Sequence, residues 1–576
     1  MREFLQQIAG VLPPRFRRAV PWLLTLIFAC TVVDVLSVGM VVPLLATIND
    51  PSWFDRQPSL ASVAQRVGAT TDSSRIILVT LALVGVQLLK STLTVLAAFW
   101  ETKAVYSTQA DLSAAVYRSY LSKPWPFFLQ SNSAVLTRTA TIEPSHVAGL
   151  LLAILRLGAE VLVLLALVAV LVIVEPVGAM AAAGLVAIAS ISFNVVTRRR
   201  VAAWGRRRLE ADNQRYFGVQ QVLSGVKECL LLGIKEHLVA RFSVANQLSA
   251  HCVQRQQFLS QLPRVWLELA AVCGLAALVF LMVLRQDSIA ISLPIIGLFA
   301  AAAFRLLPAA ARILGHLQTI RFSLPALRAV HDALASVQVA SQSDEVRGPD
   351  LAPGLIRLNL VRYRYPGAPT DVLCDVSLSV EPGSAIAVLG PSGSGKSTLI
   401  DVIMGLLPAT SGSITVGGTS IYANLRGWQR LIGYVPQAIF LLDDTIRRNV
   451  AFGVPDSEIS DAAVWSALRG ARLEEFVRGL PGQLDTSTGE RGVCLSGGQR
   501  QRIGIARALY INPAVLVLDE ATSALDERTE EEFVQAVMSI RGAKTVIFVT
   551  HRTSVAAKCD RVCQLVNGSL LPSAQP

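Results

Sequence analysis

The part of this 576-residue chain before about residue 320 contains apolar stretches that are long enough to cross a lipid bilayer. A helix needs about 20 mostly apolar residues to span the hydrocarbon core. The stretches that meet this requirement are Ala19–Ile48, Ile76–Trp100, Val147–Val172, Val177–Val196, Val265–Leu284 and Ile289–Ile313. The sequence therefore predicts six transmembrane helices, an even number that leaves the N-terminus and the C-terminal half on the same side.

Clusters of basic residues flank these stretches, at residues 15–18, 198–200 and 206–208. Basic loops stay on the cytoplasmic side of membrane proteins, so both chain ends are expected in the cytoplasm. Many of the basic residues behind the net charge of +11 lie in these clusters beside the apolar stretches. Because no sequence pattern of a nucleic-acid-binding module accompanies the charge, we expect no nucleic-acid partner. A basic start followed by an apolar run also resembles a signal peptide. Because no small-residue cleavage motif follows, we interpret the run as a retained membrane helix.

The composition changes after residue 340. Residues 341–353 are polar and rich in Pro, Gly and Asp, which is typical of a linker. We therefore predict a transmembrane domain at 1–340, a linker at 341–353 and a soluble domain at 354–576. The connections after the second and fourth spans are long, basic and helix-like, so the first domain is expected to extend into the cytoplasm as helices.

A glycine-rich segment in the soluble half predicts phosphate binding. The apolar strand 385–389 runs directly into Gly390, Pro391, Ser392, Gly393, Ser394, Gly395, Lys396, Ser397 and Thr398. Glycines let such a loop turn tightly, so that backbone N–H groups and the start of the next helix face phosphates. Lys396 is then expected to reach the β- and γ-phosphates of ATP, and the Ser397 hydroxyl to bind Mg²⁺.

A second apolar strand, 514–518, ends in two carboxylates, Asp519 and Glu520. Asp519 is the expected Mg²⁺ ligand, and Glu520 is the candidate general base that polarises the attacking water. Alone, this pattern is more typical of a buried strand with a solvated acidic end. Together with the phosphate loop it favours nucleotide hydrolysis.

The segment between these motifs resembles one particular family. Leu495 is followed by Ser496, Gly497, Gly498 and Gln499 and then by RQRIGIARAL. This resembles the signature motif of the ATP-binding cassette family, and the resemblance extends from about residue 355 to the end. It implies a fold class with two parts: an exporter-type helical domain of six transmembrane helices and an α/β P-loop nucleotide-binding domain. The helical domains of two chains would form a domain-swapped dimer.

The resemblance also implies roles for four further residues. Tyr365 in YRYPG would stack on adenine, and Gln437 in IGYVPQ would sense Mg²⁺ and face the membrane domain. Asp526 in SALD would lie in a loop at the dimer interface, and His551 in FVTHR would contact the γ-phosphate. Without the resemblance, an aromatic before a strand is usually core packing and a lone histidine is usually structural.

The family pattern further implies a dimer. The signature of one chain faces the phosphate loop of the other, and this chain carries one of each, so ATP hydrolysis would need two copies. No motif is degenerate, which favours a homodimer in a bacterial inner membrane; a heterodimer stays open. Importers normally use a separate binding protein, which nothing here indicates, so export or lipid flipping is expected.

Charged residues inside the spans give the best indication of the substrate, because a charge in the bilayer costs about 2.5–3.5 kcal/mol or more unless it faces a cavity or a partner. Two pairs, Arg156 with Glu160 and Arg264 with Glu268, are four residues apart and can pair within their helices. Lys90, Arg305 and Arg312 are not explained in this way. The residues of this group, with their acidic neighbours, are Asp34, Lys90, Arg156, Glu160, Arg264, Glu268, Arg305 and Arg312.

Arg305 and Arg312 are seven residues apart, hence on one helical face, and have no acidic residue within a turn. A cationic lining for an anionic headgroup explains this, since guanidinium groups bind phosphate oxygens in pairs. The alternatives are pairing between helices, for example with Asp34, or extension of Arg312 to the membrane interface.

The membrane half also resembles the flippases for lipid-linked oligosaccharides of bacterial N-glycosylation. The matching parts are the first span with Asp34 and Pro43, the segment PSWFD, LPRVWLE and FRLLPAAARIL. This resemblance implies a polyprenyl-diphosphate-linked glycan that moves from the inner to the outer leaflet, with Lys90, Arg264, Arg305 and Arg312 near the diphosphate. Two alternatives remain: an exporter of other lipids, peptides or drugs, and a membrane-tethered nucleotide sensor that transports nothing. Glu520 argues against the sensor, which needs no hydrolytic base.

Overall fold

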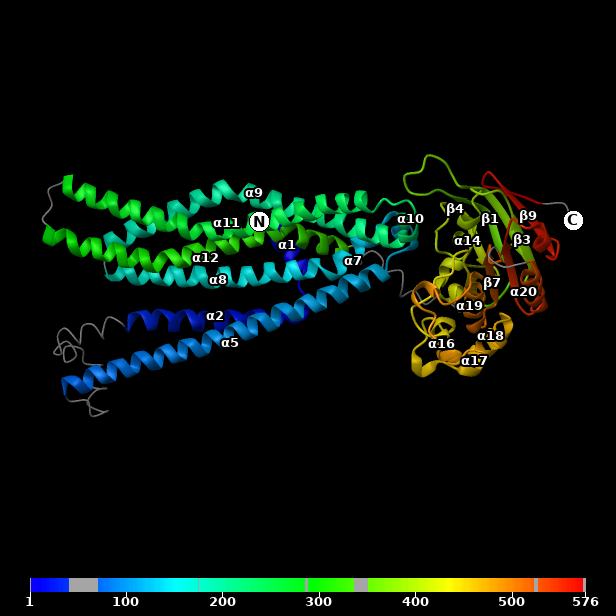
Figure 1. Ribbon diagram of the computed structural model, residues 1–576, viewed down its shortest axis with the longest axis horizontal. Helices are drawn as coiled ribbons and strands as arrows, with labels where there is room; N and C mark the ends of the chain where they lie inside the picture. Colours follow the sequence, from blue (N-terminus) through cyan, green and yellow to red (C-terminus); the bar gives the residue numbers. More distant parts are fainter. Residues whose placement is uncertain are drawn as a thin grey trace. The chain divides into compact units, whose positions relative to one another are not determined.

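The computed structural model describes residues 2–40, 71–174, 176–284, 289–335, 351–522 and 527–572. The chain forms two compact units (Figure 1). The first, helical unit comprises Met1–Lys123 and Gln130–Ala340. The second, α/β unit comprises Pro124–Leu129 and Ser341–Pro576. The predicted combination of a helical unit with an α/β unit is thereby confirmed.

The helical unit is built mainly of very long helices. Four of them have 47 to 50 residues, which corresponds to about 70–75 Å at 1.5 Å per residue, more than twice the thickness of the hydrocarbon core. Each must therefore continue well beyond the bilayer, as expected from the helix-like connections after the second and fourth predicted spans. The helices are α1 (Arg2–Val11), α2 (Pro14–Gly39), α5 (Asp72–Leu121), α7 (Ser133–Thr141), α8 (Glu143–Val174), α9 (Pro176–Ser224), α10 (Val226–Leu231), α11 (Lys235–Leu284) and α12 (Ile289–Ala335).

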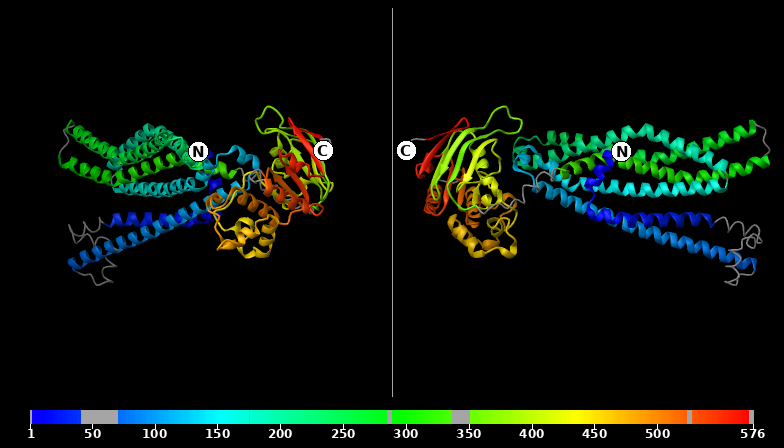
Figure 2. Two further views of the ribbon diagram at one scale, coloured as in Figure 1. Left: turned by 45° about the vertical axis from the view of Figure 1, so that its right-hand side comes forward. Right: turned by 180° about the vertical axis from the view of Figure 1, so that it is seen from behind.

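Four helical stretches of the described residues are long and apolar enough to cross a membrane: Pro14–Ser37, Ser73–Leu121, Ser133–Ile173 and Ala179–Ser224. The last two predicted spans fall in α11 and α12, where the side chains of residues 278 and 281–305 lie outside the described part of the chain. Within the unit, α8 packs against α12, α9 packs against α11 and α12, and α2 packs along α5 (Figure 2).

The α/β unit contains two sheets. The first is antiparallel, with strand order β2-β1-β4-β5. The second has the order β10-β9-β3-β8-β7-β6 and is parallel except for β10. The strands are β1 (Ile356–Tyr363), β2 (Leu373–Val380), β3 (Ala385–Leu389), β4 (Ser411–Val416), β5 (Thr419–Ser420), β6 (Ile432–Val435), β7 (Val515–Asp519), β8 (Thr545–Val549), β9 (Arg561–Val566) and β10 (Ser569–Pro572).

Helices cover this parallel sheet and connect its strands, as parallel strands require. Alternate residues of one strand enter two different cores: Ala385 and Ala387 of β3 pack in one, Ile386 and Val388 in the other. Because both faces are buried, the strands read as continuous apolar runs. The helices of this unit are α6 (Trp125–Gln130, of which residues up to Leu129 belong here), α14 (Lys396–Ile403), α15 (Leu425–Arg430), α16 (Ile446–Val450), α17 (Asp461–Gly470), α18 (Glu474–Arg478), α19 (Gly497–Tyr510), α20 (Glu527–Ser539) and α21 (Thr553–Ala556).

The segment Pro124–Leu129 belongs to the α/β unit although it lies in the sequence between α5 and α7 of the helical unit. Its Trp125 side chain hydrogen-bonds to the Asp401 carboxylate of α14. The sequence did not predict this placement, because nothing in the composition of the segment distinguishes it from the connections around it.

Candidate functional site

The parallel sheet brings the predicted nucleotide-binding motifs to one edge. The phosphate loop follows β3, His551 follows β8, Asp519 ends β7, and Gln437 follows β6. These four strands are neighbours in the order β3-β8-β7-β6. The carboxyl ends of parallel strands meet at one edge of a sheet, so residues far apart in sequence converge there.

The phosphate loop forms a tight turn at the start of α14. Gly395 has φ 100°, a left-handed conformation that favours glycine, and the helix begins at the next residue. The buried Lys396 Nζ donates hydrogen bonds of 2.9 Å and 3.0 Å to the carbonyls of Gly390 and Pro391. Ser392 and Ser397 are exposed, while Ser394 is buried with no hydrogen-bond partner for its hydroxyl among the described atoms. The loop thus surrounds its lysine and presents the start of α14 to a ligand.

Asp519 lies at the buried end of β7. Burial raises the pKa of its carboxyl, and the neighbouring Glu520 raises it further, while a hydrogen bond with Tyr434 and the charge of Lys396 oppose the shift. The Tyr434 hydroxyl lies 3.5 Å from Asp519 Oδ2. A buried carboxylate of this kind is stabilised by a cation, which fits its expected role.

Glu520 is held from two sides. The Gln437 amide donates a 2.7 Å hydrogen bond to Oε2, and His551 Nδ1 lies 3.7 Å from Oε1. Its backbone N–H also donates to the carbonyl of Val549. Gln437 and His551, the expected Mg²⁺ sensor and γ-phosphate contact, are therefore brought to the carboxylate of Glu520, which is held as a general base needs to be.

Ser496 and Gln499 begin α19 as a reciprocal cap. The Ser496 side chain accepts a hydrogen bond from Gln499 N, and the Gln499 side chain accepts one from Ser496 N. The Ser496 side chain is exposed, so this helix start is open to an anion from outside the chain. Gly497 and Gly498 supply the first turn without side chains. The role of this signature at the phosphate loop of a second chain stays a prediction.

Tyr365 lies beside the phosphate loop. Its hydroxyl is 3.1 Å from Thr398 Oγ1, and its ring meets Tyr363 edge-on. This places an aromatic ring near the nucleotide site, and stacking on adenine stays a prediction. Asp526, the predicted interface residue, lies outside the described residues. Sequence reasoning missed Tyr434, whose signal was available as the aromatic three residues before Gln437 in IGYVPQ.

Two of the cations that the sequence places in the spans, Lys90 and Arg264, have acidic partners. Lys90 of α5 pairs with Asp34 of α2, the acidic residue that the sequence analysis had offered as a partner for Arg305 or Arg312. Arg264 pairs with Glu268 at 2.8 Å, as expected from their spacing. The side chain of Arg305 lies outside the described residues, as do Pro43 and the segment PSWFD.

Arg312 pairs between helices, which is the alternative that the sequence left open. Arg312 Nε of α12 donates a 2.6 Å hydrogen bond to Glu160 Oε1 of α8. Arg156 of α8, expected to pair with Glu160, lies instead 3.6 Å from Glu101 of α5. Spacing along one helix identifies only partners on that helix, whereas α8 packs against both α12 and α5. The charges form a cluster across three helices.

Comparisons with known proteins agree with this architecture. A profile of the family described as ABC transporter matches residues 373–523. An ATP-dependent lipid A-core flippase of Alkalilimnicola ehrlichii is 30% identical over 472 residues, 80% of this chain and 78% of the relative. One from Pseudomonas putida is 31% identical over 492 residues, 82% of this chain and 78% of the relative.

The fold is also that of a solved structure, a bacterial Atm1-family ABC exporter with ATP bound. It has a TM-score of 0.75 and 22% sequence identity, with 96% of this chain and 94% of that one covered. The chain therefore belongs to the ABC transporter family, and it is a multi-pass half-transporter of the exporter type that couples ATP hydrolysis to transport.

Proposed function

We propose that this half-transporter works as a homodimer in a bacterial inner membrane and flips an anionic, amphipathic lipid from the inner to the outer leaflet. The proposed substrate is a polyprenyl-diphosphate-linked oligosaccharide. Similarity to flippases named for lipid A-core supports a lipid substrate. Transport of peptides, drugs or other lipids on the same scaffold is the alternative.

The observation that carries this proposal is the charge cluster of α5, α8 and α12. Arg156 and Arg312 each direct Nε toward a carboxylate, of Glu101 and Glu160 respectively. A guanidinium group has five N–H donors, so the Nη groups of both remain for a ligand. The side chains are 45% and 53% exposed, while the carboxylates are largely buried. Two preoriented cations with free donor edges suit a diphosphate.

The position of the cluster fits capture from the inner leaflet. Glu101 directly follows the predicted span that ends at Trp100, and Arg312 lies at the end of the span predicted to finish at Ile313. Both ends are cytoplasmic in the predicted topology. A headgroup bound there would be at the depth of the inner leaflet, with its apolar chain alongside the apolar helices.

The nucleotide site supports hydrolysis with Mg²⁺. Ser397, Gln437 and Asp519 offer a hydroxyl, an amide oxygen and a carboxylate, the oxygen ligands that Mg²⁺ prefers. The raised pKa of Asp519, caused mainly by burial, is what a cation partner would offset. Mg²⁺ would neutralise charge on the phosphates, while Glu520, held by Gln437 and His551, accepts the proton of the attacking water.

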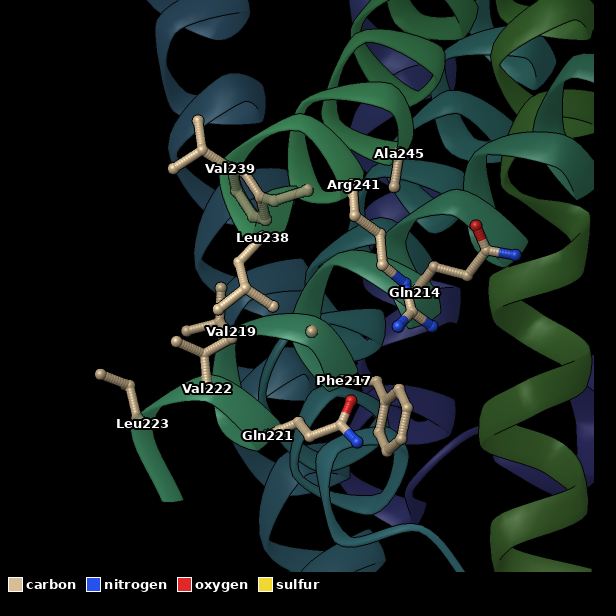
Figure 3. Close-up of a pocket in the computed structure, with 12 residues that line it drawn as sticks. Gln214, Phe217, Val219, Gln221, Val222, Leu223, Leu238, Val239, Arg241 and Ala245 are labelled. Atoms are coloured by element: carbon tan, nitrogen blue, oxygen red, sulfur yellow. The ribbon is translucent and has the colours of Figure 1, made fainter. Parts of the chain in front are cut away.

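An unpartnered apolar surface supports the homodimer. The end of α9 and the start of α11 form a groove whose lining includes Phe217, Val222 and Leu238 (Figure 3). Beyond it, the side chains of Leu230, Leu231 and Leu232 are exposed. Phe217 is 21 residues past Val196, about 30 Å along the helix, so lipid does not cover this surface. Exposed apolar surface of this kind is typical of a protein interface, and a second copy is the partner we propose.

The substrate proposal is tested with the double variant Arg156→Gln/Arg312→Gln. In proteoliposomes it is expected to lose flipping of a labelled polyprenyl-diphosphate glycan, because the phosphate ligands are removed, while basal ATP hydrolysis persists. Arg255→Gln/Arg528→Gln removes two exposed cations elsewhere and serves as the control. Undiminished flipping by the Arg156/Arg312 variant would refute the cationic headgroup site, and equal transport of labelled peptides or dyes by the wild type would favour the alternative.

A further inference from the structure

The cytoplasmic extension of α9 carries arginines on two different faces. Its buried face comprises Thr197, Val201, Gly205, Arg208 and Asp212, which recur every three or four residues. A Cβ atom on Gly205 would lie 2.4 Å from the Phe322 carbonyl oxygen, so α9 packs backbone against backbone on α12 here. The register of this face decides which arginines are buried.

Arg208 is on the buried face and has structural partners. Its side chain is 2% exposed and lies 3.3 Å from Glu143 and 3.7 Å from Asp212. It also contacts His146, and its guanidinium lies 5.6 Å from the Phe322 ring centre. This arginine is committed to the packing of α8, α9 and α12.

The other five arginines are exposed and form what we call the α9 arginine patch: Arg198, Arg199, Arg200, Arg206 and Arg207. Within the described part of the chain, no hydrogen bond or ion pair to a carboxylate is found for any of them. Arg199 and Arg206 are seven residues apart, as are Arg200 and Arg207, so each pair shares a helical face.

The neighbouring groups do not neutralise the patch. Arg321 of α12 lies close enough to Arg198 for mutual repulsion, and its own hydrogen bond goes to the neutral Asn194 side chain at 2.5 Å. Glu210 is exposed but forms no ion pair with the patch among the described residues, and Asp212 is hydrogen-bonded to Ser249 and paired with Arg208 and Arg215. Five cations are therefore exposed with no compensating carboxylate among the residues that the structure describes.

The patch starts directly below the bilayer. The apolar stretch of α9 ends at Val196, so Arg198–Arg200 lie at headgroup depth. Arg206 and Arg207 lie about 15 Å beyond Val196, within about one Debye length of the headgroup layer. All five are thus placed to interact with an anionic membrane surface.

We infer that the α9 arginine patch binds anionic phospholipid headgroups of the inner leaflet. This inference goes beyond the proposed transport function. It rests on that proposal only for the topology, in which the extension of α9 past Val196 lies on the cytoplasmic side. Each basic side chain near an anionic membrane surface raises the binding constant by roughly fivefold. Bulk phospholipid is the occupant favoured over the transported substrate, because the patch lies on the exposed face of one helix, whereas Arg156 and Arg312 form a cluster with carboxylates of several helices.

The test compares two charge-matched variants of the full chain. The patch variant lacks three charges of the patch and is Arg199→Gln/Arg200→Gln/Arg206→Gln. The control variant lacks three exposed charges of the α/β unit and is Arg357→Gln/Arg430→Gln/Arg472→Gln. Phosphatidylglycerol is titrated into the detergent-solubilised protein without ATP, and bound lipid is counted by native mass spectrometry. The patch variant is expected to lose affinity by about tenfold or more, since three charges are removed, and the control by less than about twofold.

Two further measurements keep the inference open to refutation. Arg199→Lys/Arg200→Lys/Arg206→Lys retains charge and is expected to retain binding, and wild-type binding is expected to weaken as salt rises from about 0.05 M to 0.3 M. Unchanged phosphatidylglycerol affinity in the glutamine variant, or salt-independent binding by the wild type, would overturn the inference. A change in oligomeric state with unaltered lipid binding would also overturn it and assign the patch to a contact between copies. Because no flipping is measured, the proposed substrate can fail independently.

Discussion

Glu520 is the residue on which the proposed hydrolysis depends. It follows the last residue of β7 with φ 47°, an unusual conformation for a residue with a side chain, and its N–H is fixed by the carbonyl of Val549. Gln437 and His551 flank its two carboxylate oxygens. The backbone is therefore constrained to aim this carboxylate at the edge where the phosphate loop begins.

Glu520→Gln is expected to lower ATP turnover by about a hundredfold or more while ATP binding persists, because the amide cannot accept the proton of water. Steady-state phosphate release and equilibrium binding of labelled ATP measure the two effects. Glu381→Gln, which removes an exposed carboxylate of the same unit, is the matched control. Normal turnover in the Glu520 variant would reject its role as general base.

Asp401 is a second carboxylate with an altered pKa. Burial raises its pKa to about 6 from 3.8, Asp519 adds to the shift, and the hydrogen bond from Trp125 opposes it. Above about pH 6 the Asp401 carboxyl is ionised in both the folded and the unfolded protein, and its burial in the folded state lowers the free energy of unfolding. Below about pH 4 the carboxyl is protonated in both states, so this destabilisation is absent.

Asp401→Asn is therefore expected to stabilise α14 at pH 8 by about 1–3 kcal/mol and to have little effect near pH 4. Hydrogen exchange of the α14 amides in the full chain, measured at each pH, gives the free energy of opening of this helix. Asp443→Asn, at an exposed aspartate, should change nothing. A gain that grows as the pH falls would contradict the sign of the shift.

At the scale of elements, four helices of the helical unit are joined by buried charges. Arg138 of α7 lies 2.7 Å from Glu143 of α8, which also meets Arg208 of α9 at 3.3 Å. Asp212 of α9 accepts a 2.7 Å hydrogen bond from Ser249 of α11. Arg138, Glu143 and Arg208 are nearly inaccessible to solvent. Three cations, Arg138, Arg208 and the partly exposed Arg215, surround the carboxylates of Glu143 and Asp212, so removal of a carboxylate leaves buried cations without a partner.

Glu143→Gln is expected to destabilise the protein by about 3–5 kcal/mol, because Arg138 and Arg208 then share only the carboxylate of Asp212. Thermal unfolding in detergent, followed by size-exclusion chromatography, measures the loss. Adding Arg138→Met should recover part of it, since one uncompensated cation disappears. Additive losses in the double variant would show that the charges act independently, contrary to this account.

The elements differ in how well the sequence predicted them. β3 and β7 were predictable, because a strand buried on both faces must be a continuous apolar run that ends where polar chemistry begins. The long helices were predictable in kind, but not in their contacts. The partner of Arg312 is on α8, and that of Lys90 is on α2; helix periodicity carries no information about neighbours that are 152 and 56 residues away.

At the scale of the whole molecule, one chain carries one phosphate loop and one signature. The motifs and their order were sufficient to predict the family, while the roles of the individual nucleotide-site residues stay predictions. The substrate was not predictable in the same way, because a paired guanidinium and an unpaired one look alike in sequence. The placement of Pro124–Leu129 in the α/β unit likewise depends on tertiary contacts that composition does not encode.

The proposed homodimer predicts complementation between two inactive variants. Lys396→Ala disables the phosphate loop and Ser496→Arg disables the signature, so each homodimer has two defective sites. A mixed dimer places both defects in one site and leaves the other intact. Random mixing is therefore expected to recover up to roughly a quarter of wild-type ATP turnover in a two-fold dimer. No recovery after subunit exchange, or full activity of either variant alone, would contradict shared sites.

The most direct test of the account follows a labelled polyprenyl-diphosphate glycan in proteoliposomes that contain the purified chain. The account predicts that ATP with Mg²⁺ drives the lipid from the leaflet on the nucleotide-binding side to the opposite leaflet, and that Glu520→Gln stops this movement. Equal movement without ATP, or undiminished movement by the Glu520 variant, would contradict it.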